Sequence, residues 1–181
     1  MGKLVFGMMQ SLDGYVDGVG DTLQFPPPGP ALTQHFNDQF RRNAGSLNGR
    51  RMYEIMRYWD EDRPEWDASD REFAQLWRAK PKWVVSRSLK SVGANATLVA
   101  GGLEAFARKL KTDIDGEIDV GGPDLAGQLT ALGLIDEYRL YYRPLVLGAG
   151  KPFFSGARPP LRLVATERFG DEAVCVTCVP A

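Results

Sequence analysis

The stretch IDVGGPDLAGQLTALGLIDEYRLYYRPLVLGAGKPFF, residues 118–154, decides the fold that we expect for this chain. A short apolar strand runs into Gly121-Gly122, and Pro123 stands where a helix can begin, because the first helical position leaves its N–H unpaired. Gly133 suits the cap that ends such a helix. Three leucines at i, i+4 and i+7 form one face of that helix: Leu125, Leu129 and Leu132.

The paired glycines at this strand-to-helix turn have a physical use. Without Cβ atoms, the backbone can approach a ligand closely and direct its N–H groups toward it. The helix N-terminus adds unpaired donors and a positive dipole end, which suit a phosphate group. Paired glycines also occur in tight turns that bind nothing, so the spacing leaves both interpretations open.

The composition is that of an ordinary globular domain. The chain has 181 residues, 44% of them hydrophobic and 25% charged, so we expect one domain spanning residues 1–181. A formal net charge of -1 and the lack of any Lys/Arg block argue against nucleic acid as a partner. The apolar run at residues 4–9 is too short for a signal peptide or a membrane span. We therefore expect a cytoplasmic protein without a membrane partner.

The two cysteines, Cys175 and Cys178, are spaced C-x-x-C, which invites a redox or zinc interpretation. The surrounding EAVCVTCV predicts a strand, however, and residues i and i+3 of a strand point to opposite faces. Apart from these two cysteines, the chain contains no cysteine, and its single histidine, His35, lies far away in the sequence. We predict two ordinary thiols and no metal site.

Strands and helices alternate along the chain, and two strands finish it. This pattern predicts an α/β fold with a mostly parallel central sheet and antiparallel C-terminal strands. The expected strands are 3–10, 44–48, 82–85, 97–99, 118–120, 137–144, 161–169 and 173–179. The expected helices are 31–42, 49–56, 103–110, 123–132 and one that ends at Ala79, for which Ser69 or Asp70 is the expected cap.

The central stretch also fits a longer pattern. GG-x-x-L-x-x-x-L-x-x-x-GLIDEY-x-L-x-x-x-P-x-x-LG-x-GKP-x-F resembles the C-terminal half of the dihydrofolate-reductase-like family, and within it the riboflavin-biosynthesis reductase branch, the RibD C-terminal domain, and its stand-alone relatives. The segments SLDG at 11–14 and GRRMYE at 49–54 extend the resemblance. It implies a three-layer dihydrofolate-reductase-like fold, NADPH as cofactor, a small-molecule substrate and, as often in the family, a homodimer. The tyrosine-rich strand 138–142 is either an interface or a strand buried on both faces.

The resemblance also implies which residues lie near the nicotinamide ring. These are the backbone around Met9, before the SLDG turn, and Val16 and Asp17, after it. Asp13 in that turn either fixes the loop or touches the substrate. The proline-rich segment 18–30 follows as a loop with two apolar residues that it could place over a substrate: Leu23 and Phe25.

A second phosphate-type segment is GRRMYE at residues 49–54. A glycine and two arginines at a helix start combine dipole, backbone donors and guanidinium forks, although arginines on a solvated helix start look the same in sequence. The resemblance implies that Gly49 and Met52 flank the phosphates, with Arg50 on the 2′-phosphate and Arg51 on the pyrophosphate, or the reverse. Met52 replaces a threonine of the family, so one hydroxyl contact is lost while the backbone N–H remains.

Two further segments complete the expected cofactor site. Ser86 and Arg87 follow a strand, and the resemblance implies that they hold the 2′-phosphate, which favours NADPH over NADH. A second glycine pair, Gly101-Gly102, precedes a helix but matches no strong family motif. The resemblance implies that the central turn surrounds the pyrophosphate with five residues: Gly121, Gly122, Pro123, Asp124 and Leu125.

The substrate side is less defined by the sequence. His35 lies on an apolar helix face, where a single histidine is either a packed residue or a catalyst. Dihydrofolate reductases proper carry an acidic residue on this helix, and Phe36 stands at that place, so the chain departs from the folate-reducing pattern. Lys151 in the glycine-rich loop either attracts a substrate phosphate or is a solvated lysine.

The resemblance thus predicts an NADPH-dependent reductase of the riboflavin-pathway type, with hydride transfer like that of a 5-amino-6-(5-phosphoribosylamino)uracil reductase. Two alternatives stay open. One is a reductase of dihydrofolate, a pteridine or another small molecule. The other is an NADP(H)-binding module without turnover.

Overall fold

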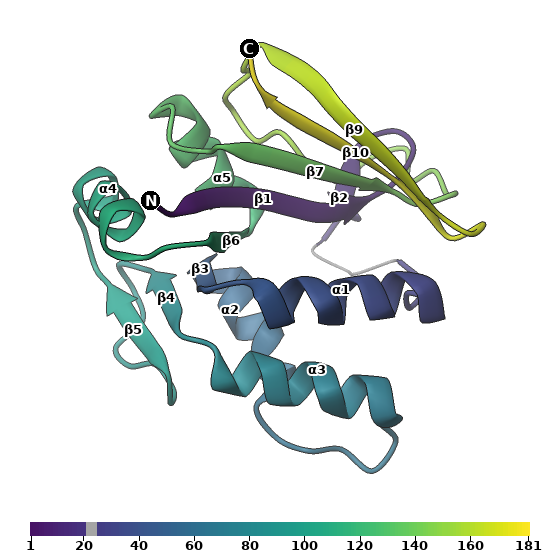
Figure 1. Ribbon diagram of the computed structural model, residues 1–181, viewed down its shortest axis with the longest axis horizontal. Helices are drawn as coiled ribbons and strands as arrows, with labels where there is room; N and C mark the ends of the chain where they lie inside the picture. Colours follow the sequence, from purple (N-terminus) through teal and green to yellow (C-terminus); the bar gives the residue numbers. More distant parts are fainter. Residues whose placement is uncertain (21–24) are drawn as a thin grey trace.

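An eight-stranded sheet forms the middle layer of the computed structural model, which describes residues 1–20 and 25–181 (Figure 1). The strand order is β5-β4-β3-β6-β1-β7-β10-β9. The six strands from β5 to β7 are parallel to one another. β10 is antiparallel to β7, and β9 is antiparallel to β10. The strands are β1 (Lys3–Gln10), β3 (Gly45–Gly49), β4 (Lys82–Val85), β5 (Ala96–Val99), β6 (Glu117–Gly121), β7 (Glu137–Tyr142), β9 (Leu161–Phe169) and β10 (Ala173–Pro180). The predicted fold class is confirmed.

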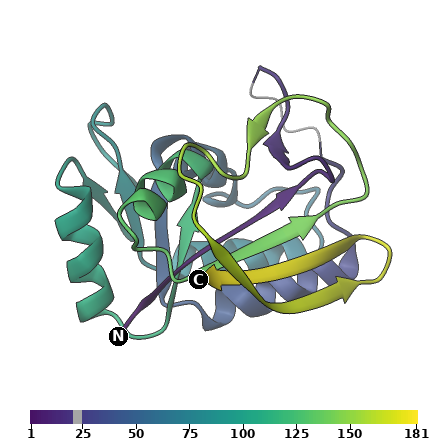
Figure 2. The same cartoon turned by 90° about the horizontal axis from the view of Figure 1, so that it is seen from above.

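Helices cover both faces of the sheet (Figures 1 and 2). The helices α4 (Leu103–Asp113) and α5 (Pro123–Ala131) pack on one face and bury the main apolar core with the strands. The other face carries α1 (Pro30–Arg42), α2 (Arg50–Met56), the short 3-10 helix η1 (Arg57–Trp59) and α3 (Ala68–Ala79). No helix within the described ranges is long and apolar enough to cross a membrane.

A second, two-stranded sheet stands at the end of β1. It pairs β2 (Tyr15–Asp17) with β8 (Lys151–Pro152) in antiparallel fashion. Gly150 fits this pairing only because it lacks a side chain, since a Cβ there would lie 2.0 Å from the carbonyl oxygen of Asp17. The small sheet therefore fastens the loop after β7 to the loop after β1. Of the proline-rich segment's two apolar residues, Leu23 lies outside the described residues, and Phe25 is partly buried.

Local signals set the ends of the helices. Pro123 occupies the start of α5, and Gly133 after its end has φ +66°, both as expected. The predicted cap of α3 was wrong. Asp67, not Ser69 or Asp70, is the N-cap, because its carboxylate accepts the backbone N–H of Asp70, whose side chain accepts the N–H of Asp67 in return.

The strands β7 and β10 carry side chains to both faces. Tyr138 and Leu140 belong to the core under α5, and Tyr141 belongs to the cluster under α1. The two cysteines of β10 divide in the same way. Cys175 joins the cluster under α1 while Cys178 packs against the core on the other face, and both are free thiols. The interior position of β7 accounts for its tyrosines as packing residues.

Asp119 is the unusual residue of the central strand β6. Its neighbours Ile118 and Val120 point into the main core, so its side chain points to the opposite face. Within residues 1–20 and 25–181 its carboxylate has no hydrogen bond or ion pair. Burial raises its pKa to about 7, although the positive charge of Arg139 acts in the opposite direction.

We expect the substitution Asp119→Asn to stabilise the protein at alkaline pH. The folded state keeps a proton on Asp119 that the unfolded chain releases near pH 3.8, so stability falls as the pH rises from there to about 7. Because the side chain keeps some contact with solvent, we expect a gain of about 1–3 kcal/mol in the free energy of unfolding at pH 8. Urea unfolding at pH 8 and pH 4 checks this. An equal effect at both pH values would contradict it.

Candidate functional site

A cavity of about 960 Å³ opens at the carboxyl edge of the parallel sheet. It follows the strand order, since its walls come from the residues after β5, β4, β3 and β6 and from the end of β1 with β2. Four strand spacings of about 4.8 Å make this edge roughly 19 Å long. The cavity is therefore elongated and lies where ligands of open α/β sheets bind.

The start of α2 forms the middle of one wall. Gly49, Arg50, Arg51 and Met52 all line the cavity, and their contact with phosphate stays a prediction. The Arg50 guanidinium lies 3.5 Å from the carboxylate of Glu54, one turn further along the helix. The Arg51 guanidinium lies 3.1 Å from the carboxylate of Asp17 on β2. Both arginines stand at the cavity, but with different partners.

The central glycine turn forms the facing wall. Gly122, Pro123, Asp124 and Leu125 line the cavity, and Gly122 has φ +105°, a conformation that side chains disfavour. The backbone N–H groups of Asp124 and Leu125 have no acceptor within the part of the chain that the structure describes. Two donors and a positive helix end therefore face the cavity.

Gly121 does not line the cavity, contrary to prediction. A Cβ at this position would lie 2.2 Å from Oδ1 of Asn48 on the neighbouring strand. The side chain of Asn48 is buried there and donates to the hydroxyl of Ser46. Gly121 is thus a glycine for the packing of β3 against β6, while Gly122 alone presents its backbone to the cavity.

The far end of the cavity contains Ser86 and Arg87. The hydroxyl of Ser86 accepts the backbone N–H groups of Ser88, at 3.2 Å, and Leu89, at 3.0 Å. It therefore shapes the turn, and the exposed Arg87 is the residue that this turn presents. Arg87 makes no ion pair within the described residues.

The pair Gly101-Gly102 also lines this end of the cavity. This pair was not included in the cofactor site expected from the sequence. Gly102 is the N-cap of α4 with φ +64°, and a Cβ on either glycine would meet no atom within 4 Å. Open space thus lies beside both. The signal was present in the sequence, because a glycine pair before an amphipathic helix is the same pattern as at residues 121–122.

The near end of the cavity is formed by β1 and β2. Val16 and Asp17 line it, and the residue of β1 that lines it is Met8. The predicted contact of these residues and of the backbone around Met9 with a nicotinamide ring stays a prediction. Side chains alternate along the strand, so Met9 faces α1, where its sulfur accepts a hydrogen bond from Arg143 at 3.3 Å. The sequence could place this segment, but not its register.

Lys151 and Asp124 face each other across the start of α5. Lys151 Nζ donates to one carboxylate oxygen of Asp124 at 2.5 Å, and Ser155 Oγ donates to the other at 2.9 Å. Burial acts to raise the pKa of Asp124, but these two hydrogen bonds and the positive charges of Lys151 and Arg51 together hold the pKa below its ordinary value. Lys151 thus lines the cavity and pairs with an ionised Asp124. The sequence alone had left open whether Lys151 attracts a phosphate or is a solvated lysine.

Asp13 lies outside the cavity, and its role is visible in its contacts. Its carboxylate accepts the backbone N–H groups of Leu147, at 3.1 Å, and Gly148, at 2.7 Å. The Ser11 hydroxyl and these two N–H groups hold its pKa below the ordinary value. Of the two interpretations of Asp13, this geometry matches the residue that fixes a loop.

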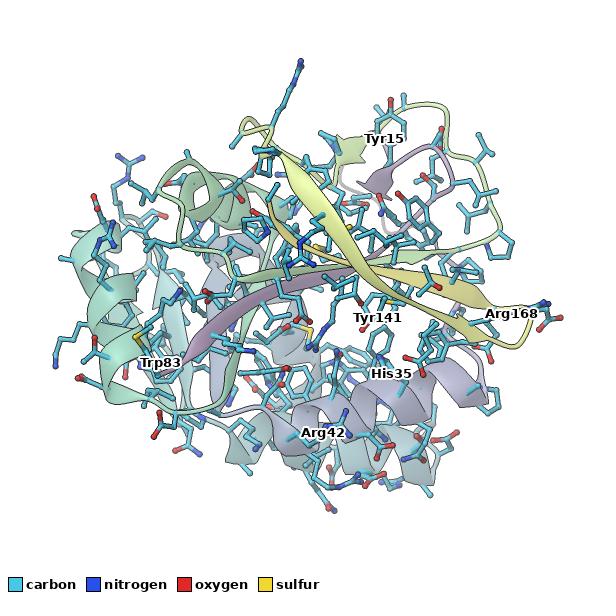
Figure 3. All side chains as sticks on the ribbon, turned by 45° about the horizontal axis from the view of Figure 1, so that its top comes forward. Tyr15, His35, Arg42, Trp83, Tyr141 and Arg168 are labelled. Carbon is cyan, nitrogen blue, oxygen red and sulfur yellow. The ribbon has the colours of Figure 1, made fainter. Side chains whose placement is uncertain are left out.

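His35 also lies outside the cavity. Its Nε2 is 2.9 Å from the hydroxyl oxygen of Tyr141, and that oxygen accepts a hydrogen bond from Gln39 Nε2 at 3.0 Å (Figure 3). Its ring packs against Phe169, with 4.5 Å between centroids. Burial lowers the pKa of His35, so the ring is neutral at neutral pH. These contacts describe a packed histidine, and its catalytic role stays a prediction.

The cavity fits a dinucleotide phosphate cofactor. The glycines of three turns give close backbone approach, the start of α5 offers two N–H donors, and four cations stand along the walls: Arg50, Arg51, Arg87 and Lys151. Within the described ranges, no three His, Cys, Asp or Glu residues are grouped so that they could hold a metal ion.

The strand order and the cavity at the carboxyl edge define the class, an α/β protein with a dihydrofolate-reductase-like fold. The family model of the RibD C-terminal domain matches residues 2–175. The chain therefore belongs to the RibD C-terminal domain family.

One bacterial relative and several solved structures are similar to nearly the whole chain. The chain is 28% identical over 178 residues to the uncharacterized protein YyaP of Bacillus subtilis (strain 168), covering 95% of this chain and 92% of that protein. A putative riboflavin biosynthesis protein from Shewanella sp. PV-4 is similar over 99% of both chains, with a TM-score of 0.77 and 22% identity. The diaminohydroxyphosphoribosylaminopyrimidine deaminase/5-amino-6-(5-phosphoribosylamino)uracil reductase from Thermotoga maritima matches 99% of this chain but 56% of its own, with a TM-score of 0.70 and 16% identity. These two structures share the fold.

We expect Asp13→Ala to loosen the loop after β7. Without the carboxylate, the backbone N–H groups of Leu147 and Gly148 lose their acceptor, so both amides should exchange with solvent faster. Hydrogen exchange measured by NMR checks this. Lowering the pH below the ordinary aspartate pKa of 3.8 should have the same effect in the unmodified protein. Unchanged exchange at these two amides would show that Asp13 does not hold the loop.

Proposed function

We propose that this protein is an NADPH-dependent reductase of the riboflavin-pathway type, acting on a small-molecule substrate. The observation that carries the proposal is the single cavity that combines three glycine turns with four cations along the carboxyl edge of the sheet. The family model and the names of the solved structures point in the same direction. Hydride transfer like that of a 5-amino-6-(5-phosphoribosylamino)uracil reductase is the reaction that we propose.

The charges along the cavity support one orientation of the cofactor. At the end near β4 and β5, Arg50 pairs with Glu54 at 3.5 Å, and Arg87 makes no ion pair within the described residues. This end suits the 2′-phosphate of the adenosine half. At the other end Met8 and Val16 give apolar surface, and the acids Asp17 and Asp124 pair with cations. That end suits a ring without phosphate.

The residues of the middle would hold the pyrophosphate. The backbone N–H groups of Asp124 and Leu125 lie at the start of α5, opposite Arg51 on the start of α2. Charge-assisted hydrogen bonds from such groups are stronger than neutral ones. When bound, NADPH supplies the hydride, and the chain's own residues bind it, orient it and exclude water.

A folate substrate receives less support. The position on α1 that would carry an acid is Phe36, whose ring packs against Tyr141 with 5.1 Å between centroids. No carboxylate can therefore protonate a pterin from that position. The riboflavin-pathway pyrimidine is accordingly the first substrate to test, and dihydrofolate the second.

Titration of the purified protein with NADPH and with NADH, followed by cofactor fluorescence, tests the proposal. We expect NADPH to bind more tightly by about tenfold, the equivalent of one charge-assisted contact. Arg87→Ala should remove most of this preference, because Arg87 stands at the 2′-phosphate end. Equal affinity for both cofactors in the unmodified protein would contradict the assignment of that end.

The double variant Arg50→Ala with Arg51→Ala should weaken NADPH binding by on the order of 2–4 kcal/mol, because two charge-assisted contacts are lost. Arg57→Ala is the matched control, since Arg57 follows on η1, pairs with Asp60 at 3.3 Å and does not line the cavity. If the double variant binds NADPH as tightly as the control, the cofactor does not lie against the start of α2.

A further inference from the structure

Asp17 is a buried acid in a cavity that otherwise favours anions. Its side chain is 11% exposed, whereas that of Asp124, the other carboxylate on the described walls, is 63% exposed. One oxygen of Asp17 accepts the backbone N–H of Gly18 at 2.9 Å, and the other accepts the guanidinium of Arg51 at 3.1 Å. A buried carboxylate is costly, and here it also opposes the phosphates that the cavity would hold.

The position of Asp17 suggests what this charge could do. Asp17 follows Val16 on β2 and lies at the apolar end of the cavity, with Met8 of β1, whereas β5 lies at the other end. This is the end that the proposed function assigns to the nicotinamide ring. The inference therefore rests on that function.

The chemistry at that end creates a positive charge. In the proposed reaction, a carbon of the ring releases two electrons and a hydrogen nucleus as hydride, and the C–H bond forms on a carbon of the substrate's C=N or C=O group. The substrate heteroatom takes a proton from water. The substrate is reduced, and the ring, neutral before the step, becomes oxidised and carries one positive charge. A fixed negative charge nearby stabilises this change.

We propose that Asp17 makes the cavity favour the oxidised, positively charged nicotinamide ring over the neutral reduced ring. The same interaction stabilises the charge that develops during hydride transfer. Because it acts on the charge of the ring, it changes the relative affinity for the two oxidation states of the cofactor.

The pairing with Arg51 does not cancel this effect. The Arg51 side chain is 35% exposed, so water screens its charge more than it screens the carboxylate. Arg51 also lies at the start of α2, opposite the start of α5, where the pyrophosphate would bind. The guanidinium would therefore face phosphate oxygens, while the carboxylate would stay nearer to the ring.

A purely structural role for Asp17 makes a different prediction. If the carboxylate only positioned Arg51, its loss would change the affinity for both oxidation states by the same factor, since both carry the same pyrophosphate. The ratio of the two affinities thus separates the two roles, and it can be measured without knowing the substrate.

The test compares the dissociation constants of NADPH, by fluorescence titration, and NADP⁺, by displacement of NADPH. In Asp17→Asn we expect the ratio of the NADP⁺ constant to the NADPH constant to rise about fivefold to tenfold, as for loss of a nearby, partly screened charge. NAD⁺ and NADH should show the same shift, because each pair differs only in the charge of the ring.

Matched variants define the outcome. Asp17→Glu keeps the charge and should keep the ratio, and Asp60→Asn should leave it unchanged because Asp60 does not line the cavity. If Asp17→Asn does not fold, Arg51→Gln gives an independent measurement and should shift the ratio in the opposite direction. An equal change in both constants, or no change in the ratio in Arg51→Gln, would overturn the inference. Failure of the unmodified protein to bind either cofactor would overturn the proposed function and the inference with it.

Discussion

The parallel pairing of β5, β4, β3, β6 and β1 is the constraint on which the site depends. Parallel strands in register end at one edge, and here Asn48 pairs with Gly121 while Val85 pairs with both Gly49 and Val99. The residues that follow these strands are consequently brought side by side, although they lie far apart in the sequence. Helix starts and loops then face a common cavity, because each helix begins where a strand has just ended.

Electrostatics divide this cavity along its length. The cations near β4 and β5 have few acid partners, whereas Arg51 and Lys151 near β2 and α5 each have their own carboxylate. One end is therefore suited to phosphate, and the other end has compensated charge and apolar walls.

The near end of the cavity is held in place by the loop that follows β7. The loop after β7 is fixed to Asp13 by two backbone N–H groups, to β2 by the small sheet, and to α5 through Ser155 and Lys151. Each attachment joins parts of the chain that are remote in sequence. The SLDG turn and the loop that contains GKP thus hold each other in place. This contact accounts for the carboxylate of Asp13 in a turn that lies outside the cavity.

The sequence by itself determined what depends on near neighbours. The leucine spacing, Pro123 and Gly133 predicted α5, the alternation of elements predicted the sheet, and the glycine and arginine segments predicted most of the cavity walls. Only the tertiary structure decided which side chain of each segment faces the cavity. The register of β1 turns the side chain of Met8 to the cavity and that of Met9 to α1, Gly121 accommodates Asn48, and the hydroxyl of Ser86 accepts N–H groups of its own turn. Such choices depend on partners from other strands, and no local periodicity contains that information.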